Sequence, residues 1–173
     1  MKKAFSFLVL VFLSGTFSAR LSAELSMPHI FADHMVLQRN EAVNLWGSAS
    51  PKEKVTVELN GQKTSVRADA SGKWNATLRP MEAGGPYTLI VKGKKERLAF
   101  DDVLLGEVWI CSGQSNMEFR LHAAMNAEKE IADAENYSFL RSFNVKQEMS
   151  HRPLSDSVSY THLRAHETSQ DLV

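Results

Sequence analysis

The sequence has few of the residues that a disulfide-linked, metal-binding or nucleic-acid-binding protein needs. It holds one cysteine, Cys111, and no Cys-x-x-Cys or Cys/His cluster, which excludes an internal disulfide framework and a zinc finger. Its 20 Lys and Arg balance 20 Asp and Glu, so the formal net charge is zero and a basic nucleic-acid binder is not expected. With 43% hydrophobic and 23% charged residues, the composition is that of a globular protein.

The first 23 residues have the pattern of a secretory signal peptide. Lys2 and Lys3 precede an apolar run that extends from Ala4 to about Leu13. That run is shorter than the about 20 residues that a membrane-spanning helix needs. We therefore predict cleavage after Ala23, with Ala19 as the alternative site. The mature protein is expected to be secreted or periplasmic in a bacterium and to have no membrane association.

The last residues, 157–173, are expected to be foreign to the protein. The segment Val158–Thr168, VSYTHLRAHET, resembles one reading frame of a sequencing-library adapter, and it has no clean period of 2 or 3.6. We therefore predict that the authentic sequence ends at Asp156. On this interpretation, no histidine of the tail belongs to a catalytic site.

Residues 24–101 are predicted to form an antiparallel β module resembling a sandwich. Apolar residues alternate with polar ones around Val55–Leu59, and the pattern recurs in 64–68, 74–78, 87–91 and 98–100. Asn60-Gly61 is a strong hairpin signal, and Asp69–Gly72 predicts a second turn. Residues 80–86, which contain two prolines and two glycines, predict a loop. The module carries no residues that indicate catalysis.

Residues 102–156 are predicted to begin an α/β domain that is incomplete. Val103–Cys111 is almost continuously apolar, as expected for a strand buried on both faces of a parallel sheet. A polar turn follows, and Glu118–Glu135 has apolar residues at helical spacing. Phe143–Val145 is expected to begin another strand. Strand, tight turn and helix form the opening unit of an α/β domain.

A serine between a buried strand and a helix N-terminus is well placed to act as a nucleophile. Unpaired backbone N–H groups at the helix start favour negative charge and can serve an oxyanion hole. Ser115 occupies that turn, and Gly113 allows the chain to turn sharply there. The pattern alone favours a simple helix cap by Ser112, Ser115 or Asn116 over a nucleophile.

Two blocks of sequence carry a resemblance to a known family. The block GEVWICSGQSNMEF, residues 106–119, is similar to the first catalytic block of the sialate O-acetylesterases, which are SGNH-type hydrolases. The block FADHMVLQR, residues 31–39, with LWG at 45–47, resembles the N-terminal region of the same family. The resemblance covers nearly all of residues 25–156, and it implies that the α/β domain is of the SGNH type, with a flavodoxin-like fold.

The resemblance implies a serine esterase that needs no metal or organic cofactor. Ser115 matches the family nucleophile, and its backbone N–H would be one oxyanion donor; Gly113, Gln114 and Asn116 would support the pocket. The expected substrate is an O-acetylated sugar, and the expected reaction removes O-acetyl groups from sialic acid.

The family's general-base His, in an Asp-x-x-His block, has no counterpart in this chain. His122 and His151 are poor substitutes, because one follows the nucleophile on its helix and the other lies in a Ser-His-Arg-Pro loop. Since general acid–base help is worth about 10²–10⁴ in rate, the fragment itself is expected to be inactive.

Two other functions remain open from the sequence. The same chemistry could act on other acetylated polysaccharides, because the residues that would set specificity lie elsewhere in such an enzyme. A different class of function is a non-catalytic secreted protein that binds carbohydrate or has a structural role.

Overall fold

The computed structural model describes residues 23–113, 119–145, 151, 156 and 159–164. The predicted signal peptide therefore lies outside the described residues, apart from Ala23. In the described part of the chain, no helix is long and apolar enough to cross a membrane.

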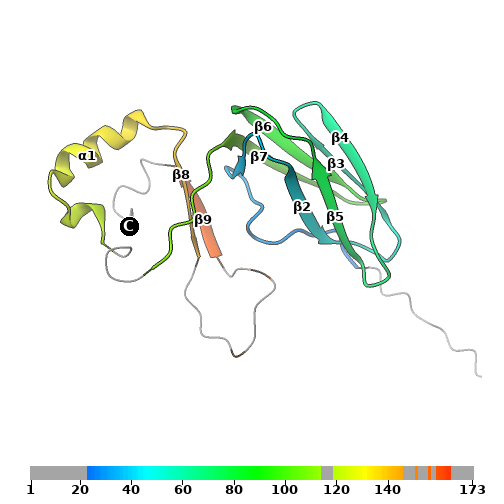
Figure 1. The fold of residues 1–173 in the computed structure, drawn as a ribbon. Coiled ribbons are helices and arrows are strands. Elements are labelled where there is room, and N and C mark those ends of the chain that lie inside the picture. The colour runs from blue at the N-terminus through cyan, green and yellow to red at the C-terminus, as the bar shows by residue number, and fades with distance from the viewer. Residues whose placement is uncertain (1–22, 114–118, 146–150, 152–155, 157–158, 165–173) are drawn as a thin grey trace, which may run out of the picture.

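Seven strands between residues 36 and 106 form the main body (Figure 1). Five of them make one sheet in the order β1-β7-β6-β3-β4, and the other two, β2 and β5, make a separate pair. The bounds are β1 Val36–Gln38, β2 Val43–Ser48, β3 Lys54–Leu59, β4 Gln62–Arg67, β5 Lys73–Leu78, β6 Gly84–Lys92 and β7 Arg97–Gly106. The two sheets enclose one core, as the sequence predicts for a sandwich-like module.

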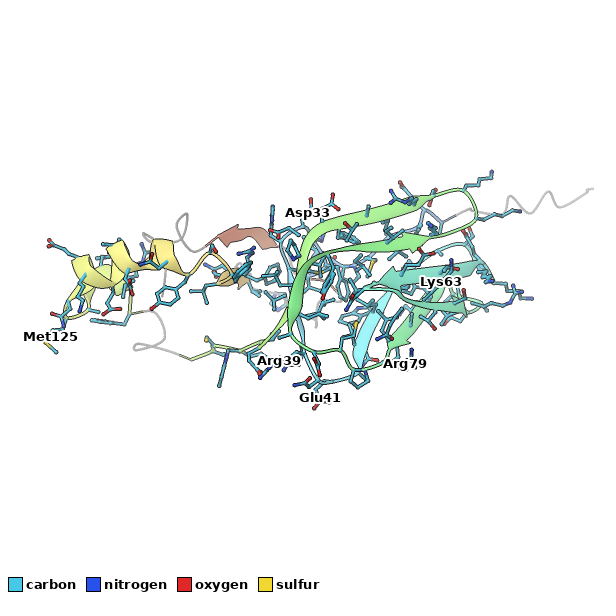
Figure 2. The ribbon with its side chains drawn as sticks, turned by 90° about the horizontal axis from the view of Figure 1, so that it is seen from above. Asp33, Arg39, Glu41, Lys63, Arg79 and Met125 are labelled. Atoms are coloured by element: carbon cyan, nitrogen blue, oxygen red, sulfur yellow. The ribbon has the colours of Figure 1, made fainter. Side chains whose placement is uncertain are left out.

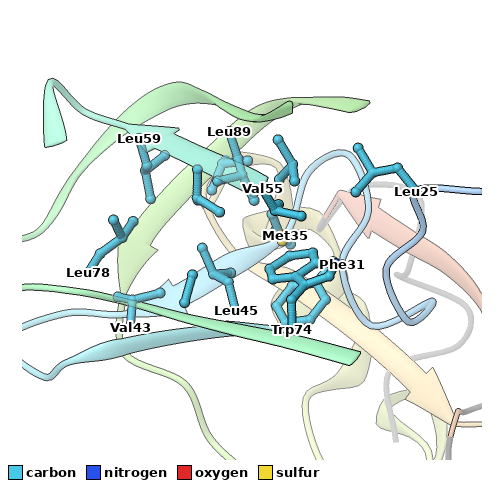
Figure 3. Close-up of a cluster of buried hydrophobic side chains, with 14 of the residues drawn as sticks. Leu25, Phe31, Met35, Val43, Leu45, Val55, Leu59, Trp74, Leu78 and Leu89 are labelled. Atoms are coloured by element: carbon cyan, nitrogen blue, oxygen red, sulfur yellow. The ribbon is translucent and has the colours of Figure 1, made fainter. Parts of the chain in front are cut away.

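The alternating sequence pattern sets the inward face of each strand. In β3 and β5 every second residue is buried, because successive side chains of a strand point to opposite faces. Figure 3 shows Leu45 and Trp74 facing Val55 and Leu89 across the core. Leu45, Val55 and Leu89 are fully buried, so the core extends across both sheets.

The predicted turns are present. Asn60 and Gly61 both have positive φ, 44° and 72°, and they join β3 to β4 as a tight hairpin. In the second turn, the carboxylate of Asp69 accepts hydrogen bonds from the backbone N–H of Ser71 and Lys73. The predicted loop 80–86 is shorter than expected, since β6 already begins at Gly84 opposite Leu105.

Strand β1 pairs in parallel with β7, with Val36 opposite Leu104 and Gln38 opposite Gly106. All other strand pairs in this sheet are antiparallel. The parallel pairing brings two segments that are almost 70 residues apart in the sequence to the same edge of the sheet. Both segments carry the motifs that resemble the esterase family.

The predicted strand Val103–Cys111 is only partly present and has a different setting. Val103–Gly106 are the end of β7 and belong to the sandwich, which therefore continues past residue 101. Residues 107–111 are not a strand, and Trp109 and Ile110 are 84% and 93% exposed. A uniformly apolar run cannot show by itself where burial stops, because it has no alternation to mark the two faces.

The region after the turn has less regular structure than the predicted helix Glu118–Glu135. It holds a short 3-10 turn, η2 (Leu121–Ala123), one helix, α1 (Ala127–Asp133), and a second 3-10 turn, η3 (Ala134–Asn136). Asn126, with a left-handed φ of 63°, separates η2 from α1. None of the apolar residues predicted to line the helix is fully buried: Leu121, Ala124 and Ile131 are half-buried, and Met125 and Ala132 are exposed. Met125, 89% exposed, lies at the far end from the sandwich (Figure 2).

The strand expected around residues 143–145 is present as β8 (Arg141–Val145). It pairs antiparallel with β9 (Ser159–Arg164), so it joins no parallel sheet among the described residues. The expected α/β fold of the SGNH type is therefore not completed by these elements. Strand β7 runs across the predicted division at residue 101, and the end of the α/β domain at residue 156 remains a prediction.

Candidate functional site

The candidate site begins where the chain leaves the sandwich at the end of β7. Glu107 follows that strand, and its carboxylate accepts hydrogen bonds from Arg39 Nε at 2.6 Å and Gln38 Nε2 at 3.0 Å. These bonds, first from Gln38 and then from Arg39, lower the pKa of Glu107 below its ordinary value. The amide oxygen of Gln38 in turn accepts the backbone N–H of Val108.

Both motifs of the family resemblance therefore meet at one point in the structure. Arg39 also donates its backbone N–H to the carbonyl of Gly106 at 2.9 Å, which extends the β1–β7 pairing by one bond. Gln38 and Arg39 hold Glu107 and Val108 by backbone and side-chain bonds. These bonds fix the position of Glu107 and Val108, where the chain leaves β7 toward the serine turn. The next residues, 109–112, are exposed.

Of the predicted site residues, Gly113 alone lies in the described part of the chain. It has a φ of 155°, a backbone conformation that side chains with a Cβ rarely adopt. Gln114, Ser115 and Asn116 lie outside the described residues, as does most of the predicted tail. Their roles as pocket support and nucleophile stay predictions. Cys111 is exposed, whereas the sequence favours a small core residue there.

A second polar cluster, which no sequence pattern indicated, lies where β7 faces the segment after α1. Asp102 Oδ2 accepts a hydrogen bond from His34 Nδ1 at 2.6 Å and another from Arg141 Nη2 at 3.1 Å. These two donors, with His34 the larger effect, lower the pKa of Asp102 below its ordinary value of 3.8. Arg141 is the most buried of the three, with its side chain 5% exposed.

The cluster has a defined backbone. His34 and Asp102 both have a positive φ, 65° and 54°, a backbone conformation that is uncommon for residues other than glycine. The backbone N–H of His34 donates to the carbonyl of Asp101, and the N–H of Asp101 donates to the carboxylate of Asp33. Asp101 itself accepts from Thr88. Asp102 is 68 residues from His34 and 39 residues from Arg141 in the sequence, so no local sequence signal could have found this cluster.

A further bond links the start of the described chain to its later part. Asp156 accepts from both the backbone N–H and the ring Nδ1 of His29, at 3.0 and 2.8 Å. This contact joins residue 156 to the loop before β1, whereas the Asp102–Arg141 bond joins the segment after α1 to β7. Among the described residues, no group of three His, Cys, Asp or Glu side chains could hold a metal ion.

The chain is similar in sequence to known acetylesterases. It is 35% identical over 153 residues to the mouse sialate O-acetylesterase and 34% identical over 149 residues to the human one, covering 80% of this chain in both cases. The rat sialate O-acetylesterase is 36% identical over 135 residues. No family model matches the chain. The chain spans only about 28% of the length of the mouse and human relatives.

A solved structure has the same fold over most of the chain. It is the crystal structure of a carbohydrate acetylesterase from Xanthomonas citri, with a TM-score of 0.81 and 35% sequence identity. The match covers 86% of this chain and 34% of that one. The resemblance to the sialate O-acetylesterases, expected from residues 31–39 and 106–119, is therefore confirmed by the sequence comparison, and the structural neighbour is a carbohydrate acetylesterase.

Proposed function

We propose that the protein to which this chain belongs is a serine esterase that removes acetyl groups from acetylated sugars, with sialic acid as its substrate. The observation that carries the proposal is the similarity to proteins named as sialate and carbohydrate acetylesterases. An aligned stretch that covers 80% of the chain necessarily includes its middle. The Gly-Gln-Ser-Asn-Met sequence, residues 113–117, lies there.

In the proposed reaction, Ser115 supplies the nucleophile. Its hydroxyl oxygen attacks the acetyl carbonyl carbon, and the sugar hydroxyl leaves with a proton. Water then attacks the acetyl-enzyme and releases acetate, which restores the serine. Backbone N–H groups of the turn would stabilise the negative charge on the carbonyl oxygen, because that charge develops in the transition state.

The exposed apolar residues near the turn support a larger catalytic domain. Trp109, Ile110 and Phe139 are 84%, 93% and 68% exposed. Solvated side chains of this size are typical of a surface that another part of a protein covers. Since the relatives are several times longer, we propose that the rest of the α/β domain packs on these residues.

The proposal predicts that the complete gene product hydrolyses acetyl esters. The test is to measure acetate release from O-acetylated sialic acid, from acetylated plant polysaccharide and from a simple aryl acetate. Ser115→Ala should abolish release from all three, while Ser112→Ala, a matched change in the same turn, should leave most of it. Loss of activity in Ser112→Ala alone would overturn the assignment of the nucleophile.

Comparison of the substrates tests the sugar specificity. Preference for the sialic acid ester supports the sialate assignment, and preference for the polysaccharide supports the alternative acetyl esterase. The 173-residue chain serves as a companion sample and is expected to be inactive, because a serine hydroxyl without a general base is a weak nucleophile.

A further inference from the structure

The outward face of the β2–β5 pair has an unusual composition. The two strands lie side by side (Figure 1) and pair antiparallel over their whole length. Their inward positions are buried, and their outward positions are exposed and form a block of three cross-strand pairs. The pairs are Asn44 with Thr77, Trp46 with Asn75, and Ser48 with Lys73.

Trp46 stands at the centre of this block. It is 40% exposed, and it is the one large apolar residue among the six outward positions. Phe31, which is buried, packs against it edge-to-face, with ring centroids 4.8 Å apart and an interplanar angle of 77°. This contact restrains the indole, so binding there would cost little side-chain entropy.

The neighbours of Trp46 can form hydrogen bonds and carry one positive charge. Asn75 is directly opposite, and Lys73 and Thr77 are the diagonal neighbours on the same face. The hydroxyl of Thr77 donates to the amide oxygen of Asn44 at 2.8 Å, which leaves the amide nitrogen of Asn44 oriented as a donor.

The charge on this face is one-sided. Lys73 is the single charged residue of the block, and no carboxylate occupies an outward position of either strand. Two acids lie close to the block along the chain: the exposed Glu41, three residues before Asn44, and Asp69, four residues before Lys73. Asp69 directs one carboxylate oxygen to groups of its own turn. The block therefore complements a small ligand with one negative charge, an apolar side and several hydroxyl groups.

We propose that the outward face of β2 and β5 binds a sugar that carries a carboxylate, apart from the catalytic turn. The C–H face of the sugar would lie on the indole of Trp46. Asn44 and Asn75 would bond its hydroxyl or amide groups, and Lys73 would attract its carboxylate. A nucleic acid would need several cations to neutralise its phosphates, and only one is present on this face.

The choice of a sugar over other small acids rests on the proposed function, but the binding test does not depend on hydrolysis. Free sialic acid is titrated into the 173-residue chain, and the indole N–H signals are followed by NMR. The methyl ester of sialic acid, which lacks the charge, is the matched ligand. The signal of Trp46 should shift with both ligands, and more strongly with the acid.

Three variants locate the site. Trp46→Ala should weaken binding at least about fivefold. Lys73→Gln should weaken binding of the acid about twofold to fivefold and leave the methyl ester unchanged. Trp109→Ala, which removes the other exposed indole, is the control and should bind as the parent does. If Trp46→Ala fails to fold, binding is instead measured on Lys73→Gln and Thr77→Val, which are both changes at exposed positions.

Absence of any shift at Trp46, or equal losses in the Trp46 and Trp109 variants, would overturn the proposal. Equal losses for acid and ester in Lys73→Gln would overturn the role of the charge. Ser115→Ala should retain this binding even though it loses hydrolysis in the complete protein. Failure of the sugar-binding face and failure of the esterase assignment are therefore separate outcomes.

Discussion

Arg141 donates from Nη2 to Oδ2 of Asp102 at 3.1 Å, and the two residues belong to different parts of the chain. Asp102 lies within β7 of the sandwich, and Arg141 begins β8 after the helix. The two apolar residues just before Arg141 are exposed, Phe139 by 68% and Leu140 by 52%. A buried charged side chain therefore links the segment to the sandwich, beside apolar residues that are largely in solvent.

Loss of the Arg141 side chain should release this segment. Arg141→Ala leaves Asp102 with its His34 bond and removes the link to β8, so amide hydrogen exchange in residues 139–145 should speed up about tenfold. Arg141→Lys should recover only part of the protection, because Arg141 also donates to the carbonyls of Ser138 and Leu140, and an ammonium lacks that fork.

The Glu58–Lys63 pair provides the control for that experiment. Its lysine is 63% exposed, and exposed pairs contribute about 0–1 kcal/mol. Lys63→Ala should therefore leave exchange in 139–145 unchanged. Equal exchange rates in Arg141→Ala and the parent would show that other contacts hold the segment.

The lowered pKa of Asp102 predicts an acid-dependent loss of stability. A carboxyl whose pKa is lower in the folded state contributes stability above its unfolded value and loses that contribution as the pH falls through the folded value. The contribution of Asp102 should be complete above its ordinary pKa of 3.8 and should disappear below it. The free energy of unfolding of the parent and of Asp102→Asn is measured by urea titration between about pH 7 and pH 2.

The difference between the two proteins should be largest near neutral pH and should shrink below about pH 4. Asp69→Asn is not a neutral comparison, since Asp69 also has a lowered pKa, caused first by its bond to the Ser71 hydroxyl. Glu41→Gln, at an exposed position, is the better control. A difference that stays constant over the whole range would mean that Asp102 acts through shape and not through charge.

Local patterns predicted the sandwich well. The alternation in β3 and β5 and the Asn60-Gly61 turn depend on residues close in sequence, and the structure confirms all three. The parallel pairing of β1 with β7 could not be predicted, because β1 has only three residues, all partly buried. Its position depends on the partner strand and not on its own pattern.

The candidate site was predicted from the resemblance more than from physical pattern. The run from Val103 to Cys111 is apolar throughout, so it does not reveal that Val103–Gly106 are inside the sandwich and Trp109 and Ile110 are outside it. The polar cluster of His34, Asp102 and Arg141 depends on contacts between residues far apart in the sequence. Charged residues of this kind look like ordinary surface residues in a sequence.

Two glycines with positive φ should differ in their tolerance of a side chain. Gly61 has a φ of 72° and open space where a Cβ would lie, whereas a Cβ on Gly72, φ 85°, would lie 2.5 Å from the carbonyl oxygen of Ala49. Gly61→Ala should cost about 1 kcal/mol, the strain of the left-handed region alone. Gly72→Ala should cost clearly more, because backbone must move. If thermal unfolding shows equal losses of stability for the two variants, the backbone around Gly72 shifts at little free-energy cost.

The end of the sandwich can be located by truncating two apolar residues of the same run. Leu105 is 3% exposed in β7, and Ile110 is 93% exposed five residues later. Leu105→Ala removes buried methyl groups and leaves a cavity, so the free energy of unfolding should fall by about 2–5 kcal/mol. Ile110→Ala touches no packed surface, and its effect should stay within about 0.5 kcal/mol. Urea unfolding of the 173-residue chain measures both. A large cost for Ile110→Ala would instead mean that residues 107–111 are packed, as the apolar run alone suggested, and that the strand continues toward the serine turn.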